Sequence, residues 1–479
     1  MIKRGPALPS PRRLGAIGAL ALLAGCALAP PYQRPDAPVA PAYPAAGPEL
    51  AGAGASAADI GWRGFFSDPR LRQLIAAALE HNRDLRTAAL RIEEARAQYG
   101  LASAERLPTL NAALGATRAR APAALGQNGR AGVGERFDAG LSMPTFELDY
   151  LGRVRSLGQA ALSLYLATEE ARQAAHLAVV AETAKAYFTE RALAEQYALA
   201  AQTLAGRERT FELTRRRLEA GAASRLDLRQ NETLYQGARA TALTLARQRA
   251  QAENALTLLV GQAPAATPTT VPAGAAPDDA ALDAMNALPA GLPSELLARR
   301  PDIRAAELRL KAANANIGAA RAAFFPRLSL TAALGSASPA FSGLFDSGSG
   351  NWSFAPQLLL PIFDGGRNRA NLSLADTRKN IAVADYEKTI QVAFREVADA
   401  LAARAYLGEQ VAAQRAVREA QGERLALLQL RFDNGVASAL DVLDAQRELF
   451  SAEQSLVQAR LLRTTTAIDL YRALGGGVE

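Results

Sequence analysis

The chain has few of the residues that reactive or metal-binding sites use. Its 479 residues include one cysteine, two histidines and three methionines. A single cysteine excludes a disulfide within the chain, and two histidines with one cysteine cannot build a conventional metal or nucleophile site. No serine–histidine–aspartate pattern or phosphate-binding loop occurs in the sequence. We therefore expect no enzymatic activity, no metal site and no cofactor held by side chains.

Long apolar runs are also missing. Hydrophobic residues make up 49% of the chain and charged residues 21%, and the mean hydropathy is -0.03. The one stretch that resembles a membrane segment covers residues 14–24, follows four basic residues and is too short to span a bilayer. We interpret residues 1–25 as a signal peptide. Its removal takes away four of the seven net positive charges, so charge gives little reason to expect a nucleic-acid partner.

Cys26 directly follows this segment. The order Leu23-Ala24-Gly25-Cys26 resembles the lipobox at which bacterial lipoproteins are cleaved and acylated. We expect Cys26 to carry a diacylglycerol thioether and an N-acyl chain, the alternative being a small residue within a signal sequence. The residue after the cysteine is Ala27 rather than the aspartate that favours retention in the inner membrane. We therefore expect the lipoprotein to reach the outer membrane. Residues 26–66 are then a lipidated tether, which begins with proline-rich sequence that favours extended chain.

An internal duplication organises the rest of the chain. Residues 217–227 match residues 431–441, and Gly261 and Gly475 are related by the same offset. This pattern predicts two copies of one helix-strand-strand-helix-helix unit. The predicted divisions are a first repeat at 67–261, an equatorial linker at 262–292, a second repeat at 293–475 and a tail at 476–479.

Each repeat contains one very long alanine-rich stretch, at residues 153–220 and 367–434. At about 1.5 Å per residue, such a helix would extend about 100 Å, which is far longer than an ordinary globular helix. The two stretches are therefore predicted to be coiled-coil-like rods. A soluble coiled-coil scaffold is an alternative that would explain the rods, but it would not explain the segments that lie between them. The remaining predicted helices cover residues 68–105, 222–261, 293–325 and 436–475.

Two pairs of alternating segments precede the rods. The predicted strands are 107–118 and 135–149 in the first repeat, and 326–335 and 351–363 in the second. Apolar residues alternate with small or polar ones, as Leu110 and Leu114 do with Asn111 and Gly115. Strands of about ten residues with this alternation are typical of outer-membrane barrels, although a half-buried soluble hairpin would also show it. Four strands cannot enclose a lumen. Because unpaired edges in lipid cost several kcal/mol per group, neighbouring chains must complete the sheet.

Three motifs carry a resemblance to a known family. They are RPDIRAAE at 300–307, leading to FPRLSL at 325–330; LPIFDGGR at 360–367; and the segment 435–445. With these motifs the chain resembles the TolC-like outer-membrane efflux factors, and more closely their NodT-like lipoprotein branch, which serves RND-type pumps. The resemblance covers nearly the whole mature chain.

This resemblance implies a mainly helical fold with a β-barrel part. It implies a homotrimer whose 12-stranded barrel in the outer membrane continues into a periplasmic α-helical barrel with an equatorial domain. The implied partners are outer-membrane lipid, a periplasmic adaptor (a membrane fusion protein) and an inner-membrane RND-type pump. The implied function is passive conduction of small compounds to the exterior. An exit duct for type I protein secretion is the alternative within the same fold.

The resemblance also implies two kinds of site near the ends of the rods. Asp441 and Asp444, three residues apart on one helical face, would line a periplasmic aperture together with Asp227, unless they are only solvated or N-terminal helix charges. The rods end in two turns of small residues, which would dock the adaptor unless they are only helix caps. The turn residues are Gly221, Ala222, Ala223, Gly435, Val436 and Ala437.

One part of the family pattern is absent. The aspartate that matches Asp227 helps to close the aperture in the family by bonding to an arginine and a tyrosine, and Ala437 and Phe432 occupy those two positions here. The closed state must therefore be held differently. Arg225 and Arg229 are candidate substitutes, because they lie next to Asp227 in the sequence.

Overall fold

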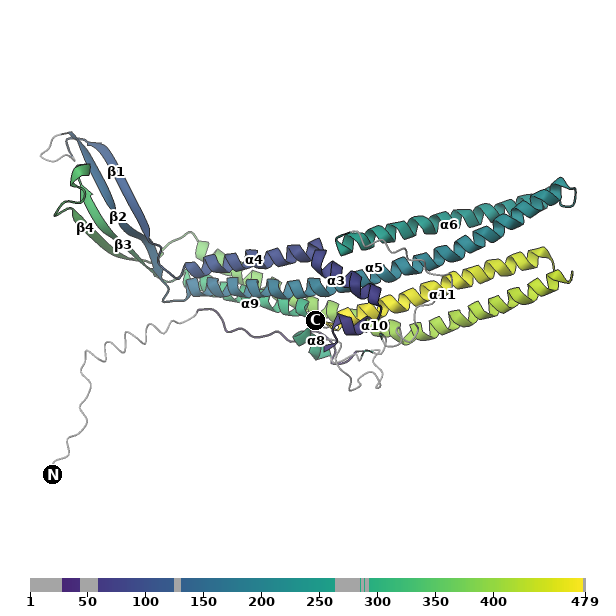
Figure 1. Cartoon of the computed structure of the whole chain (residues 1–479). Helices are drawn as coiled ribbons and strands as arrows, with labels where there is room; N and C mark the ends of the chain where they lie inside the picture. The colour runs from purple at the N-terminus through teal and green to yellow at the C-terminus, as the bar shows by residue number, and fades with distance from the viewer. Residues whose placement is uncertain are drawn as a thin grey trace, which may run out of the picture. The chain divides into compact units, whose positions relative to one another are not determined.

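The computed structural model describes residues 28–43, 59–124, 131–262, 285, 288 and 293–476. Within these ranges the chain is mainly helical and carries one four-stranded sheet, as predicted (Figure 1). Cys26, part of the predicted tether and most of the predicted linker lie outside the described residues. In chain order the elements are α2 (Trp62–Phe65), α3 (Pro69–His81), α4 (Arg83–Ala104), β1 (Asn111–Ala121), β2 (Gly132–Leu148), α5 (Arg153–Glu219), α6 (Arg225–Val260), α8 (Pro293–Arg299), α9 (Pro301–Ala322), β3 (Arg327–Ser338), the 3-10 turn η4 (Phe341–Gly343), β4 (Gly350–Leu359), α10 (Arg367–Asp433) and α11 (Ala439–Ala473).

The two halves of the chain have the same order of elements. The long helices α5 and α10 each contain 67 residues. Both are preceded by a strand pair and followed by a helix that runs back along them. The chain divides into two compact units. The first comprises Met1–Asp36, Ile92–Thr168 and Ala306–Tyr386, and the second comprises Ala37–Arg91, Glu169–Ala305 and Glu387–Glu479.

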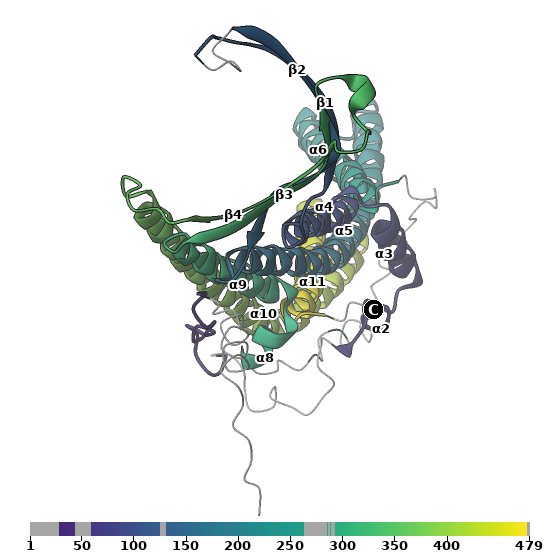
Figure 2. The ribbon, with the colours of Figure 1, turned by 90° about the vertical axis from the view of Figure 1, so that its left-hand side faces the viewer.

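All four strands belong to the first unit. They form an antiparallel sheet in the order β1-β2-β3-β4, so among the described residues β1 and β4 each have a strand partner on one side only. The sheet follows a curved path (Figure 2). The register shifts between Met143 and Phe146 of β2, and such a bulge bends and twists a strand. Curvature together with two free edges suits one part of a larger closed sheet.

The strand register sorts the side chains onto two faces. Directly paired residues of antiparallel strands lie on the same face. One face is apolar over most of its length and carries Ala112, Leu114, Ala116, Phe137, Ala139, Leu141, Met143, Phe146, Leu148, Leu328, Leu330, Ala332, Leu334, Trp352, Phe354, Pro356 and Leu358. The opposite face carries mainly small and polar residues, among them Asn111, Thr117, Asp138, Ser142, Ser329, Thr331, Ser353 and Gln357.

Prolines set two strand boundaries that differ from the predicted ones. Strand β1 begins at Asn111 rather than at 107, and β4 ends at Leu359 rather than at 363. Pro108 and Pro361 lie in the segments that were wrongly assigned to strands. Since proline has no N–H to donate to a ladder, pairing is disfavoured at both positions.

The described start of the tether packs on helix α9, within the first unit. The Arg34 guanidinium donates to both carboxylate oxygens of Glu307, at 3.2 and 2.6 Å, and the Tyr32 hydroxyl donates to the same carboxylate at 3.2 Å. Lys311 Nζ lies 3.1 Å from Glu307 Oε1 and 5.2 Å from the centre of the Tyr32 ring. Burial alone would raise the pKa of Glu307, but the bonds from Arg34 and Lys311 outweigh it and lower that pKa. The tether is thus held by a specific charged cluster.

In the second unit, Arg300 joins the start of α9 to two other helices. Its guanidinium donates to Asp302 at 2.6 Å, to Glu396 of α10 at 2.8 Å and to the carbonyl oxygen of Ala473, the last residue of α11, at 2.9 Å. The residue is only 7% exposed. Arg300 therefore supplies a donor to the C-terminal end of α11, where helix carbonyls have no partner within their own helix.

Candidate functional site

The turn between α5 and α6 and the turn between α10 and α11 have the same backbone design. Gly221 and Gly435 both have a φ of +74°, a conformation that glycine adopts at little steric cost. The Ala222 N–H donates to the Arg217 carbonyl at 2.7 Å, and the Val436 N–H donates to the Arg431 carbonyl at 2.8 Å. This is the Schellman pattern that ends a helix. Both turns expose small or apolar residues, and Val436 is 66% exposed.

A capping box starts the helix that follows each turn. The Ser224 hydroxyl and N–H both donate to Asp227 Oδ2, and the Asp227 N–H donates back to the hydroxyl oxygen. Ser438 and Asp441 repeat this arrangement, with distances of 2.7 to 3.2 Å. These serines explain why α6 begins at Arg225 rather than at 222, and α11 at Ala439 rather than at 436. Hydrogen bonds from the serines lower the pKa of both aspartates.

The predicted aperture residues Asp441 and Asp444 lie one turn apart near the start of α11. Both hydrogen bonds from Ser438 fall on Oδ2 of Asp441, so Oδ1 is not needed for the cap. Asp444 pairs with Arg447 at 2.6 Å and, across the hairpin, with Arg424 of α10 at 3.6 Å. Asp441 is thus an exposed, ionised carboxylate, whereas the charge of Asp444 is shared with two arginines.

Neither candidate substitute for the family's closing contacts bonds to Asp227 within the chain. Arg229 pairs with Glu232 at 2.5 Å, and Arg225 is exposed to solvent. Phe432 is 40% exposed at the end of α10, and Ala437 lies in the turn. A role for Arg225 or Arg229 in closing the aperture therefore stays a hypothesis about contacts between chains.

The sheet exposes large apolar side chains on one of its two faces. Leu334 is 65% exposed, Trp352 77% and Phe354 57%, and all three lie on the apolar face. Exposed apolar surface that extends over four strands marks a membrane or partner interaction. Among the described residues, no helix has the length and apolar content that crossing a membrane requires.

A curved sheet with one apolar face and two free edges, in the same chain as two helical hairpins with small-residue turns, defines an outer-membrane channel component. The comparisons with known proteins agree with this class. A family model described as "Outer membrane efflux protein" matches residues 74–262 and 292–476. The chain belongs to this family, and it is a component of an efflux system rather than an enzyme.

Relatives match the chain over almost its full length. Outer membrane protein OprJ of Pseudomonas aeruginosa is 48% identical over 455 residues, which cover 95% of this chain and 94% of OprJ. Toluene efflux pump outer membrane protein TtgC of Pseudomonas putida is 47% identical over 95% of this chain and 93% of TtgC. The open-state structure of the Neisseria gonorrhoeae MtrE outer membrane channel superposes with a TM-score of 0.83 at 42% identity, covering 95% of this chain and 99% of MtrE.

Two clusters in the structure were not found from the sequence. The contacts of Glu307 with Arg34, and of Arg300 with Glu396, join residues that are far apart in the chain. The motif at 300–307 contains one partner of each contact, Arg300 and Glu307, but no local pattern shows which distant residue each of them contacts. Within the described residues, no three histidine, cysteine, aspartate or glutamate side chains form a group that could hold a metal ion.

Proposed function

We propose that three copies of this chain form the outer-membrane duct of a tripartite efflux pump, with their sheets joined into one continuous barrel. An adaptor and an RND-type pump would deliver small compounds to its periplasmic end, and the duct would conduct them passively. The observation that carries this proposal is the curved sheet with two free edges and an exposed apolar face. Only sister strands can pair such edges in lipid without leaving backbone groups unsatisfied.

We also propose that the mature chain is anchored through acylated Cys26. The start of the tether supports this, because Tyr32 and Arg34 are fixed on α9 by Glu307. A tether that is fixed only a few residues after the cysteine would hold the acyl chains at a defined distance from the body. Two or three acyl chains are enough for stable membrane attachment.

The two turns are the proposed docking surface for the adaptor. Their small residues allow another backbone to approach closely, and the matching geometry of Gly221 and Gly435 gives each chain two similar tips. In a trimer, Asp441, Asp444 and Asp227 would contribute carboxylates to the periplasmic aperture. A ring of carboxylates attracts cations and repels anions.

The aperture proposal predicts a change in ion selectivity. The double variant Asp441→Asn, Asp444→Asn keeps side-chain volume and removes two negative charges per chain. In planar bilayers we expect the permeability ratio of potassium to chloride to fall several-fold, measured as a shift of the reversal potential in a KCl gradient. Asp433→Asn is the control, because this exposed carboxylate precedes the turn and bonds only locally to Gln429 among the described residues. Unchanged selectivity in the double variant would place both aspartates outside the conducting path.

Gene deletion tests the function as a whole. We expect deletion to lower resistance to a panel of antibiotics, dyes and organic solvents several-fold, and complementation with the intact gene to restore it. Export of secreted proteins should be unaffected. Loss of a secreted protein with unchanged drug susceptibility would favour the type I secretion alternative and contradict the efflux proposal.

A further inference from the structure

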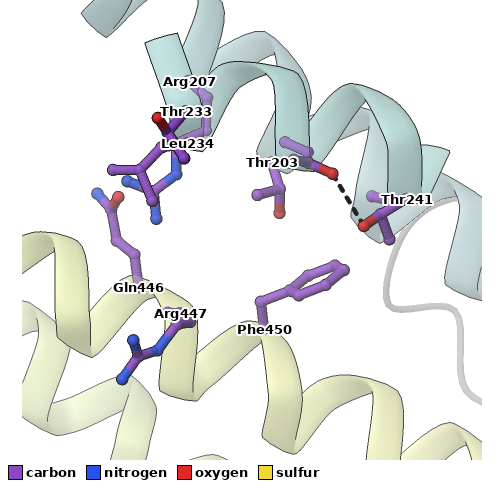
Figure 3. Close-up of a pocket in the computed structure, with 11 residues that line it drawn as sticks. Thr203, Arg207, Thr233, Leu234, Thr241, Gln446, Arg447 and Phe450 are labelled. Atoms are coloured by element: carbon purple, nitrogen blue, oxygen red, sulfur yellow. Dashed lines mark hydrogen bonds between the residues drawn. The ribbon is translucent and has the colours of Figure 1, made fainter. Parts of the chain in front are cut away.

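A groove lies between the α5–α6 hairpin and helix α11, within the second unit (Figure 3). Its volume is about 210 Å³. Arg207 of α5, Leu234 of α6 and Phe450 of α11 line it, together with small and hydroxyl-bearing residues. An adjoining hollow of about 310 Å³ shares Arg207 and Phe450 with it. Arg207 therefore lines both hollows, whose walls come from α5, α6 and α11 and, in the adjoining hollow, from Leu425 of α10.

Arg207 is a buried cation without a counter-charge from the described residues. It is 7% exposed, and it makes no ion pair with any described carboxylate. Its Nη2 donates to the Leu443 carbonyl at 3.4 Å, which is a long hydrogen bond, and the buried Nη1 has no partner among the described residues. Burial lowers the pKa of Arg207. A buried guanidinium with an unused donor is costly unless an anion accepts from it.

The other charged groups beside the groove and the adjoining hollow are either paired or exposed. Arg447 pairs with Asp444 and Glu448, at 2.6 and 3.1 Å. Glu453 lines the adjoining hollow and pairs with Arg418 at 3.9 Å. The threonines of the groove each donate to a carbonyl of their own helix, as the Thr203 hydroxyl does to Leu199. Arg209 also lines the adjoining hollow, but it is exposed, and its Nε donates to the Ala205 carbonyl at 3.2 Å. The buried cationic donor left to face the groove is Arg207.

Apart from Gln446 of α11, the remaining wall of the groove is apolar. Leu234 and Phe450 face the space that Arg207 also lines (Figure 3). Ala200 and Ala238 line it too. A guanidinium that shares one groove with an aliphatic and an aromatic side chain suits an amphiphilic anion. We propose that this groove binds a small organic carboxylate, with its head on Arg207 and its apolar tail between Leu234 and Phe450. This site goes beyond conduction, because the ligand would join the first helical hairpin to α11 and stabilise their packing.

The test uses the purified full-length protein in detergent, with sodium benzoate as the probe. At constant ionic strength, benzoate should raise the unfolding temperature in a saturable manner, because a ligand that binds only the folded state stabilises it by mass action. Benzamide, a neutral analogue of the same shape, should have no effect. Acetate should bind more weakly than benzoate, because it lacks the apolar tail.

Two variants separate the site from general salt effects. Arg207→Gln should weaken benzoate binding in calorimetry about tenfold or more, since it removes a charge-assisted hydrogen bond. Arg216→Gln, farther along the same helix, exposed and outside the lining of both the groove and the adjoining hollow, should bind like the unmodified protein. If Arg207→Gln does not assemble, Leu234→Asp provides the test, since its own carboxylate should raise stability and abolish the benzoate effect. An equal response to benzoate and benzamide, or an unchanged affinity in either groove variant, would overturn the proposal.

Discussion

Leu334→Arg is expected to destabilise the membrane-inserted sheet by about 2–4 kcal/mol, the cost of one arginine near the middle of a lipid-facing barrel surface. Leu334 lies near the centre of the apolar face, where it pairs with Leu141 of β2 and with Trp352 of β4. In a trimer the cost is incurred three times. We therefore expect a strong loss of heat-modifiable oligomer from the outer-membrane fraction, measured by electrophoresis of unheated samples.

Ala333→Arg is the matched control for this variant. Ala333 is the adjacent residue of β3 and is also exposed, but it pairs with Ser142 and Ser353 on the polar face. Its arginine would face water in the lumen, so assembly should be close to normal while conductance changes. Equal loss of assembly in both variants would contradict the assignment of the two faces and, with it, the membrane-spanning role of the sheet.

Arg300→Met is expected to lower the free energy of unfolding by about 3 kcal/mol. This figure is the lower end of the range for breaking a buried ion pair. The lower end of the range applies because Glu396 is partly exposed and still has an ion pair with Arg472, at 3.9 Å, in the variant. The variant leaves the Ala473 carbonyl and one oxygen of Glu396 without the donor that Arg300 supplies. Chemical denaturation followed by circular dichroism measures the change.

Arg395→Met controls for the loss of a positive charge next to Glu396, on the helix α10 that Arg300 contacts. Arg395 is 71% exposed and lies 3.8 Å from Asp399, an exposed pair that contributes at most about 1 kcal/mol. We expect the unfolding midpoint of this variant to stay near that of the unmodified protein. A similar small loss in both variants would mean that Arg300 does not hold α9, α10 and α11 together.

Most of the fold could be predicted because its signals are local and repeated. The two long helices were expected at 153–220 and 367–434, and they are found at Arg153–Glu219 and Arg367–Asp433. Alternation along single strands predicted the two faces of the sheet correctly. Errors arose where one side chain decides a boundary, as Ser224 does for the start of α6 and Pro361 does for the end of β4.

The candidate site was only partly predictable. Gly221 and Gly435 can be recognised from the sequence, because a positive φ at a helix end favours glycine. The pairing of Asp444 with Arg424 could not be predicted, since it depends on how α10 and α11 pack side by side. The buried guanidinium of Arg207 has no sequence signal at all. Arg207 and Arg209 lie on the same charged stretch, and only the packing of α11 buries one of them and leaves the other exposed.

The sequence by itself determined the duplicated order of helices and strands, the need for partner strands and the absence of catalytic chemistry. Periodicity, proline and glycine positions and residue types carry this information, because each acts over a few neighbouring residues. Tertiary structure alone decided which distant charges meet, as in the contact of Arg34 with Glu307 and that of Arg300 with Glu396. Such contacts form between residues far apart in the chain, and their free energy depends on burial that no local pattern specifies.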